Sequence, residues 1–225
     1  MANILEKAAK GNPKAIDALL EQTAGKAEVL AALLGGQAKP AKLAAQITED
    51  LLLSLKNGSA DASQHPLDLL LGTAVDTSRT QTERSNSKAF FTGNLEEAAE
   101  MAELPAAGVY SGDAVKGIGC LAKAMQALTP AQRFAAVLTL LGQPAAKTGK
   151  LLSMTEGTVK ALWNQALPLI TAELEKQKKS NYSIDIPQAG QLKEMVFKAM
   201  ETAVPTKACD QAGRAAAEGF VVPVN

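Results

Sequence analysis

The sequence predicts an all-α protein, with a helical bundle in the N-terminal part followed by a helix-turn-helix module. Hydrophobic residues make up 47% of the chain and charged residues 20%, which is typical of a globular protein. Only 4% is aromatic, so the core must be built from aliphatic side chains. Alanine and leucine, which lose little side-chain freedom in a helix, recur at helical spacing between glycine and proline breaks. Convincing strand patterns are absent.

The first range, residues 1–58, is expected to form an antiparallel bundle of helices with short connections. Asn12 as N-cap and Pro13 at the first helical position begin the second helix. Gly11 ends the first helix, because glycine is a natural helix stop. Its helices are expected at residues 3–11, 12–24, 26–36 and 39–58.

The second range, residues 59–119, is expected to be a linker with irregular and helical parts. Its stretch 76–87, "DTSRTQTERSNS", is rich in Ser, Thr, Arg and Asn, and this composition predicts a mobile loop or an exposed helix. An acidic helix is expected at residues 94–104, with Asn94 as its cap.

The last two ranges are residues 120–180, which hold the helix-turn-helix module, and 181–225, a C-terminal helix and tail. Thr129 and Pro130 begin one helix of the module, and Pro168 marks a kink or a break in a later one. The helices are expected at residues 120–128, 129–142, 155–179, 191–204 and 210–219, with a short extended piece at 182–186.

Three short segments of the module have a distinctive spacing. "LTPAQR" spans residues 128–133, "LLG" spans 140–142, and "TEGTVK" spans 155–160. Gly157 follows Gly142 by fifteen residues. This stretch, about residues 128–174, resembles the fourth conserved region of bacterial sigma factors. The resemblance implies a helix-turn-helix that binds DNA or contacts RNA polymerase.

The chain departs from this family at several positions that matter for binding. Lys147-Thr148-Gly149 stands where the family commonly has Glu-Ile-Ala, and Ser153 stands where it has the glycine of the tight turn. Leu162 and Gln165 replace its usual arginines. Each missing phosphate contact lowers DNA affinity and its salt dependence, so we expect weak DNA binding.

The residues expected to bind nucleic acid lie on the predicted second helix of the module and at its basic end. Thr155 can accept a backbone N–H as N-cap, and Glu156 lies near the positive end of the helix dipole. The lysines of "EKQKK" (175–179) are either phosphate contacts or a solvated helix end. The candidates are Thr155, Glu156, Thr158, Lys160, Asn164, Gln165, Lys176, Lys178 and Lys179. Trp163 is expected in the core or an interface, not stacked on a base.

Composition argues against several other classes of protein. With 23 basic and 23 acidic residues, the formal net charge is zero, which is unlike a high-affinity DNA binder. Cys120 and Cys209 have no CxxC partner and His65 is the only histidine, so neither a metal site nor a cofactor is expected. No catalytic motif is present, so an enzyme is not expected. No signal peptide or membrane span is recognisable, which favours a cytoplasmic protein.

Three functions remain open. The first is a transcription-related protein whose module binds DNA weakly or contacts RNA polymerase. The second is a helical interaction or assembly protein, with a protein partner or a second copy of itself, that no longer reads DNA. The third is a helical bundle that binds a small molecule or lipid in a pocket lined by Met and Leu.

Overall fold

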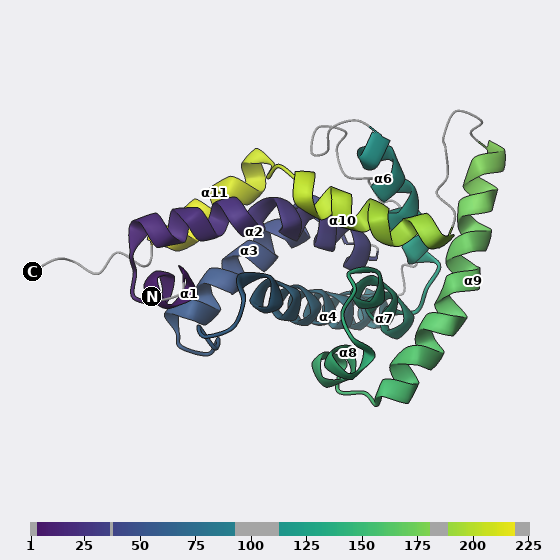
Figure 1. Ribbon diagram of the computed structural model, residues 1–225, viewed down its shortest axis with the longest axis horizontal. Coiled ribbons are helices and arrows are strands. Elements are labelled where there is room, and N and C mark those ends of the chain that lie inside the picture. The colour runs from purple at the N-terminus through teal and green to yellow at the C-terminus, as the bar shows by residue number, and fades with distance from the viewer. Residues whose placement is uncertain (1–3, 37, 93–112, 181–188, 219–225) are drawn as a thin grey trace, which may run out of the picture.

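The computed structural model describes residues 4–36, 38–92, 113–180 and 189–218, and the regular structure of this part of the chain is entirely helical (Figure 1). The predicted all-α class is therefore confirmed. The elements are α1 (Ile4–Ala9), α2 (Pro13–Leu34), α3 (Pro40–Lys56), α4 (Pro66–Thr92), α6 (Asp113–Gln126), α7 (Pro130–Leu140), α8 (Ala145–Leu152), α9 (Glu156–Ser180), a 3-10 turn (Ala189–Gln191), α10 (Leu192–Thr202) and α11 (Lys207–Glu218).

The long helix α2 is the centre of the packing. It contacts α1, α3, α4, α6, α7, α10 and α11, while α9 runs along the edge of the molecule opposite α1 (Figure 1). One hydrophobic core of mainly aliphatic side chains runs through these helices. Each of the four ranges expected from the sequence contributes a fully buried side chain to it: Leu19, Leu70, Leu121 and Val196. Burial of such side chains is the main source of stability in a helical protein.

Helix α2 is a single element, so the prediction of separate helices at residues 12–24 and 26–36 is wrong. Gly25 lies in its interior, where glycine is normally unfavourable by about 1 kcal/mol relative to alanine. The backbone of another segment explains its presence. A Cβ at Gly25 would lie within 2.2 Å of the carbonyl oxygen of Ala203, between α10 and α11. Gly25 therefore allows the backbone of the α10–α11 connection to pass close against α2.

Two predicted helix starts are confirmed in atomic detail. The Asn12 Oδ1 accepts a hydrogen bond from the Ala15 backbone N–H at 3.1 Å, which caps α2. At the start of α7, the Thr129 hydroxyl accepts from the Gln132 N–H at 3.3 Å, and the Gln132 side chain accepts from the Thr129 N–H at 3.1 Å. This reciprocal capping box satisfies two backbone donors that a helix start leaves unpaired.

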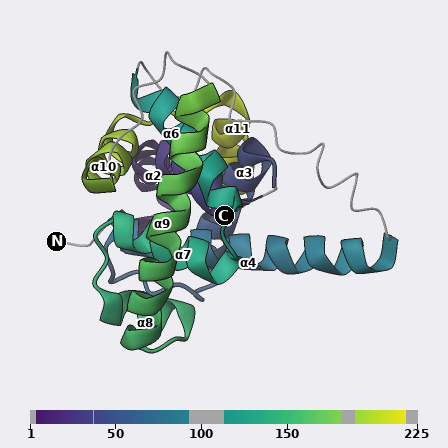
Figure 2. The same ribbon diagram turned by 90° about the vertical axis from the view of Figure 1, so that its right-hand side faces the viewer.

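The polar stretch at residues 76–87 belongs to α4, so it is helical, but it is not exposed throughout because Thr77 and Ser78 are buried. The first half of α4 packs on α2 and α3. There the Thr77 hydroxyl donates to the Asp50 carboxylate of α3 at 2.7 Å. The second half of the helix extends beyond the body of the protein (Figure 2). In the part of α4 whose side chains the structure describes, the buried residues lie between Pro66 and Ser78.

Arg133 of α7 is almost completely buried and joins three segments through backbone carbonyls. Its Nε donates to Met125 at 3.0 Å, and its two terminal nitrogens donate to Leu34 and Leu128 at 3.3 and 3.1 Å. Met125 and Leu34 lie at the C-terminal ends of α6 and α2, where unpaired carbonyls and the helix dipole favour a cation. Burial lowers the pKa of Arg133.

Helix α11 packs on α2 and α3 and confirms the short helix expected near the C-terminus. The buried Glu28 of α2 accepts a hydrogen bond from the Thr206 backbone N–H at 2.5 Å, just before α11 begins. The Cys209 thiol lies 3.1 Å from the Thr48 hydroxyl of α3, and burial raises its pKa to about 11. These contacts fix the N-terminal end of α11 on the first bundle.

Two further expectations concern the edges of the described ranges. Helix α6 begins at Asp113 instead of residue 120, as glycines 117 and 119 are accommodated within the helix. The helix expected at 94–104 and the extended piece expected at 182–186 lie outside the described residues. None of the helices in the described part is both long and apolar enough to cross a lipid bilayer.

Candidate nucleic-acid interface

Helices α7, α8 and α9 pack against one another and are joined by short connections. Between α8 and α9 the chain turns sharply at Ser153, whose φ of 56° and ψ of 43° place it in the left-handed region. The Met154 N–H closes the turn by donating to the Gly149 carbonyl at 2.8 Å. A Cβ at Gly149 would lie 2.6 Å from the Met154 oxygen, so even alanine does not fit without a shift. The turn therefore fixes the direction in which α9 leaves α8.

The turn places the start of α9 at an edge of the molecule. In Figure 1 α8 and the first turns of α9 lie at one extremity, away from α1 and α11, and Figure 2 likewise places α8 away from α11. The inner face of α9 is buried against α6, α7 and α8 through Val159, Ala166, Ile170 and Leu174. The helix continues through Pro168, where the sequence predicts a kink or a break. Its outer face is exposed on the first half of the helix.

Thr155, Glu156, Thr158 and Lys160 form a local network at the start of α9. The Thr155 hydroxyl accepts from the Thr158 backbone N–H at 3.1 Å, so the predicted N-cap is confirmed. The hydroxyls of Thr155 and Thr158 lie 2.8 Å apart. Lys160 and Glu156 form an ion pair of 2.6 Å across one helical turn. Lys160 is thus partly neutralised, and it must exchange Glu156 for a phosphate if it binds DNA.

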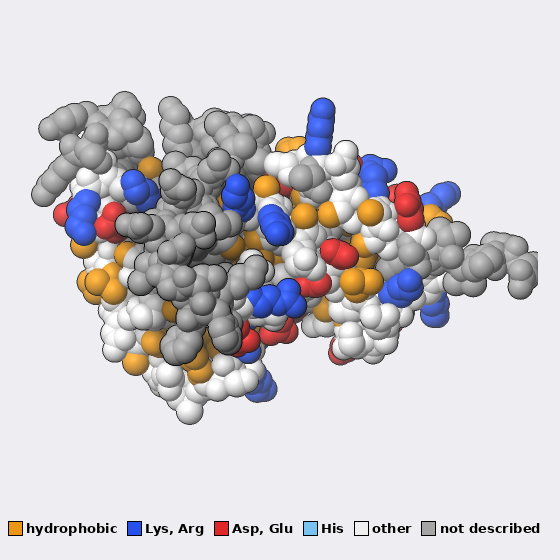
Figure 3. Space-filling model, turned by 180° about the vertical axis from the view of Figure 1, so that it is seen from behind, with side chains coloured by type: hydrophobic (Ala, Val, Ile, Leu, Met, Phe, Trp, Pro, Cys, Tyr) orange, Lys and Arg blue, Asp and Glu red, His pale blue; other side chains and the backbone are white. Residues whose placement is uncertain are grey.

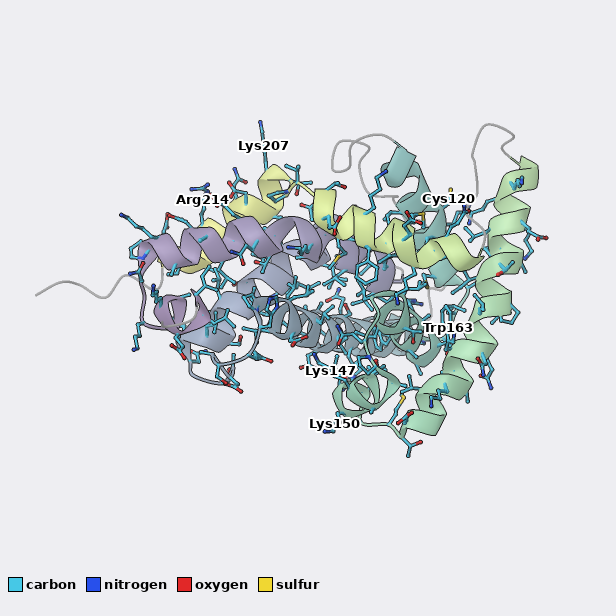
Figure 4. All side chains as sticks on the ribbon, in the orientation of Figure 1. Cys120, Lys147, Lys150, Trp163, Lys207 and Arg214 are labelled. Carbon is cyan, nitrogen blue, oxygen red and sulfur yellow. The ribbon has the colours of Figure 1, made fainter. Side chains whose placement is uncertain are left out.

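The next exposed polar residues of α9 are Asn164 and Gln165, about one turn further along the helix. The Gln165 side chain accepts a hydrogen bond of 3.4 Å from the Gln132 side chain of α7. Trp163 lies on the side of α9 toward α7 and packs against the core (Figure 4). Trp163 is partly buried, and its predicted packing against the core is confirmed.

The basic end of α9 is less positive than its sequence indicates. Lys176 pairs with Glu173 at 3.2 Å. Gln177 points inward and donates to the Cys120 carbonyl of α6 at 3.1 Å. Lys178 is exposed, while the side chain of Lys179 lies outside the described residues. This end of the helix is also a long way along α9 from Thr155, so the two groups of candidate residues do not form one site.

Two lysines of α8, Lys147 and Lys150, were not predicted as site residues. Both project from α8 on the side that faces away from α9 in this view (Figure 4). Lys147 forms an ion pair of 2.5 Å with Asp68 of α4. Lys150 is exposed and makes no ion pair with any described residue. One feature of the sequence could have identified these two lysines as candidates. They are three residues apart on the helix that precedes the predicted second helix of the module.

Among the residues that the structure describes, the rear face shows no continuous basic patch (Figure 3). Lys and Arg side chains are interspersed with Asp and Glu on the rear face (Figure 3). Within the described ranges, no group of three His, Cys, Asp or Glu residues is placed to hold a metal ion. The edge formed by α8 and the first half of α9 therefore offers hydrogen-bonding side chains and few cations.

Comparison of the chain with protein-family models, with curated proteins and with solved structures finds no match.

Proposed function

We propose that the chain is a transcription-related protein that binds duplex DNA weakly through α8 and the first half of α9. The proposal rests on one observation: the left-handed turn at Ser153 presents the start of α9 at an exposed edge, with polar side chains outward. In a helix-turn-helix the second helix enters the major groove and the first crosses the phosphate backbone. Contact with RNA polymerase stays a prediction from the sequence resemblance.

The residues at this edge divide into two roles under the proposal. Asn164 and Gln165 carry amides, which can pair with the edge of adenine in the major groove. Lys150 has no ion pair in the described ranges, so it can contact a phosphate without first breaking an ion pair, unlike Lys147 and Lys160. Thr155 and Glu156 act indirectly, since the first caps the helix and the second neutralises Lys160.

The few cations at this edge set the expected strength of binding. Lys147, Lys150 and Lys160 lie on the two helices, and two of them are already paired with carboxylates. With about one to three phosphate contacts, log K should fall with log salt concentration with a slope of about −1 to −3. Such a protein binds DNA at low salt and releases it at physiological salt.

Fluorescence anisotropy of a labelled duplex, titrated with the full chain at several salt concentrations, tests the proposal. Lys150→Gln should weaken binding at low salt and make the salt slope shallower by about 1. Asn164→Ala should weaken binding to a preferred sequence without changing the slope. Glu156→Gln should strengthen binding, because it frees Lys160.

Lys198→Gln is the matched control, because Lys198 is exposed on α10 and lies outside α8 and α9. It makes the same charge change and should leave both affinity and slope close to wild type. Absence of DNA binding at low salt would overturn the proposal. Equal effects of Lys150→Gln and Lys198→Gln would overturn the assigned surface.

The interaction-protein alternative has a weaker basis in the structure. On the second half of α9 the exposed outer face carries Pro168, Leu169 and Ala172, and Leu169 is 44% exposed. A single exposed leucine is ordinary on the surface of a monomer. Light scattering of the full chain distinguishes this alternative, since stable self-association together with failure to bind DNA would favour it.

A further inference from the structure

A cavity of about 310 Å³ lies between α4 and α8 and is closed on one side by α7. This volume is at the lower end of the range of small-molecule sites. The cavity is separate from the outer face of α9, which contributes no residue to it. Its lining consists of Gln64, Asp68, Leu71, Leu138, Gln143, Lys147, Thr148, Lys150 and Leu151.

Three leucines form the apolar part of the cavity wall, and Thr148 is the buried polar residue in it. Leu71 and Leu138 are buried and Leu151 is half-buried, and they come from three different helices. Thr148 is only 1% exposed, yet its hydroxyl has no hydrogen-bond partner among the described atoms. Buried hydroxyls are normally paired, because an unpaired one loses its bonds to water without replacement. Thr148 thus brings an unsatisfied hydroxyl to the lining of the cavity.

The charges at the cavity favour an anion. Asp68 and Lys147 neutralise each other through their 2.5 Å ion pair. Lys150, which has no ion pair with a described residue, leaves the lining with one net positive charge. A cationic ligand would meet this charge unfavourably. A single net positive charge beside three leucines instead matches a molecule with one negative charge and an apolar body.

We propose that the cavity between α4 and α8 binds a small amphiphilic monocarboxylate. Its carboxylate accepts hydrogen bonds from the Lys150 ammonium and the Thr148 hydroxyl, and its apolar body lies against Leu71, Leu138 and Leu151. This proposal does not depend on DNA binding. Lys150 takes part in both proposals, whereas Thr148 is buried and belongs to the cavity alone.

Titration of the full chain with octanoate, followed by calorimetry, tests the proposal, with 1-octanol as the uncharged probe of similar apolar body. Octanoate should bind saturably at one site and about tenfold more tightly than 1-octanol, as expected when a charge-assisted hydrogen bond is lost. Equal binding of the two probes would overturn the assignment of a carboxylate. No saturable octanoate binding would overturn the site itself.

Two variants locate the site. Thr148→Val keeps the shape of the side chain and removes the hydroxyl, and Lys150→Gln removes the charge. Each should weaken octanoate binding by about tenfold. Because Lys150 is exposed, Lys150→Gln leaves the fold intact even if Thr148→Val disturbs it.

Matched controls exist for both variants. Ser78 of α4 is the other described side chain with a buried, unpartnered hydroxyl, and it does not line the cavity. Ser78→Ala and Lys198→Gln should therefore bind octanoate like the wild type. If Thr148→Val and Lys150→Gln bind octanoate no more weakly than these controls, the cavity is not its site.

Discussion

The Arg133 guanidinium lies 3.3 Å from the carbonyl oxygen of Leu34, a residue 99 positions earlier in the chain. Leu34 is the last residue of α2, and Arg133 begins the second turn of α7. Gly36 makes this contact possible, since a Cβ there would overlap a terminal nitrogen of Arg133 and its φ is +58°. The contact ties the helices that carry the candidate interface to the N-terminal bundle.

Arg133→Met should destabilise the protein by about 3 kcal/mol, because it removes a charged donor from three buried carbonyls, of which the Met125 carbonyl keeps the Leu128 N–H. Chemical denaturation followed by the fluorescence of Trp163, the only tryptophan, measures this loss. Arg214→Met on the exposed face of α11 is the control and should change stability little. Equal stabilities of the two variants would contradict the anchoring role of Arg133.

Gly25→Ala should destabilise the protein by more than about 1 kcal/mol, although alanine is the better helix former. The added Cβ would overlap the Ala203 carbonyl, so α2 or the α10–α11 connection must move. Gly119→Ala in α6 is the matched control, because a Cβ there meets nothing within 4 Å. It should stabilise the protein by up to about 1 kcal/mol. Thermal unfolding of the pair distinguishes packing from helix propensity.

Ser153→Gly should stabilise the protein by about 1 kcal/mol, since a left-handed backbone is costly for a residue with a Cβ. Ser153→Val should have the opposite effect, because a β-branched side chain is least tolerated there. Denaturation midpoints of the two variants should bracket that of the wild type. A loss of stability in Ser153→Gly would show that the serine side chain contributes more than the backbone strain.

Glu28 should make stability depend on pH in the mildly acidic range. Burial raises its pKa above the ordinary value of 4.5, with hydrogen bonds from Thr206 opposing the shift. A carboxyl whose pKa is higher in the folded state stabilises the protein fully below its unfolded pKa. That contribution is lost as pH rises through the folded pKa.

Glu28→Gln keeps an acceptor for the Thr206 N–H and removes the ionisation. Its free energy of unfolding should exceed that of the wild type at pH 7, and the two should converge near pH 4. Glu28→Ala instead removes the acceptor and should lose about 1 kcal/mol at both pH values. Parallel pH profiles of Glu28→Gln and wild type would refute this role for Glu28.

Local sequence signals predicted the parts of the fold that local interactions determine. The caps at Asn12 and Thr129 depend on residues within three positions, and both form as expected. The break expected at Gly25 was wrong because the reason for that glycine lies at Ala203, far along the chain. The polar stretch in α4 allowed two interpretations, since composition alone does not distinguish an exposed helix from a loop.

The candidate interface was predictable to the same limited extent. The cap at Thr155 follows from residue type and spacing, and it forms. The pairing of Lys147 with Asp68 joins helices distant in sequence, so no local pattern indicates it. The cavity could not be predicted from local patterns either, because its leucines come from three helices, α4, α7 and α8. The unpaired hydroxyl of Thr148 also depends on packing that the sequence does not show.

The position of Cys209 gives the protein an internal reporter of partial unfolding. Its thiol is fully buried between α2, α3 and α11, and burial raises its pKa to about 11, so alkylating reagents should not reach it in the native state. In a Cys120→Ala background, the rate of labelling at Cys209 would then measure how often α11 detaches. Comparison of that rate with global unfolding would show whether the C-terminal helix opens as a unit of its own.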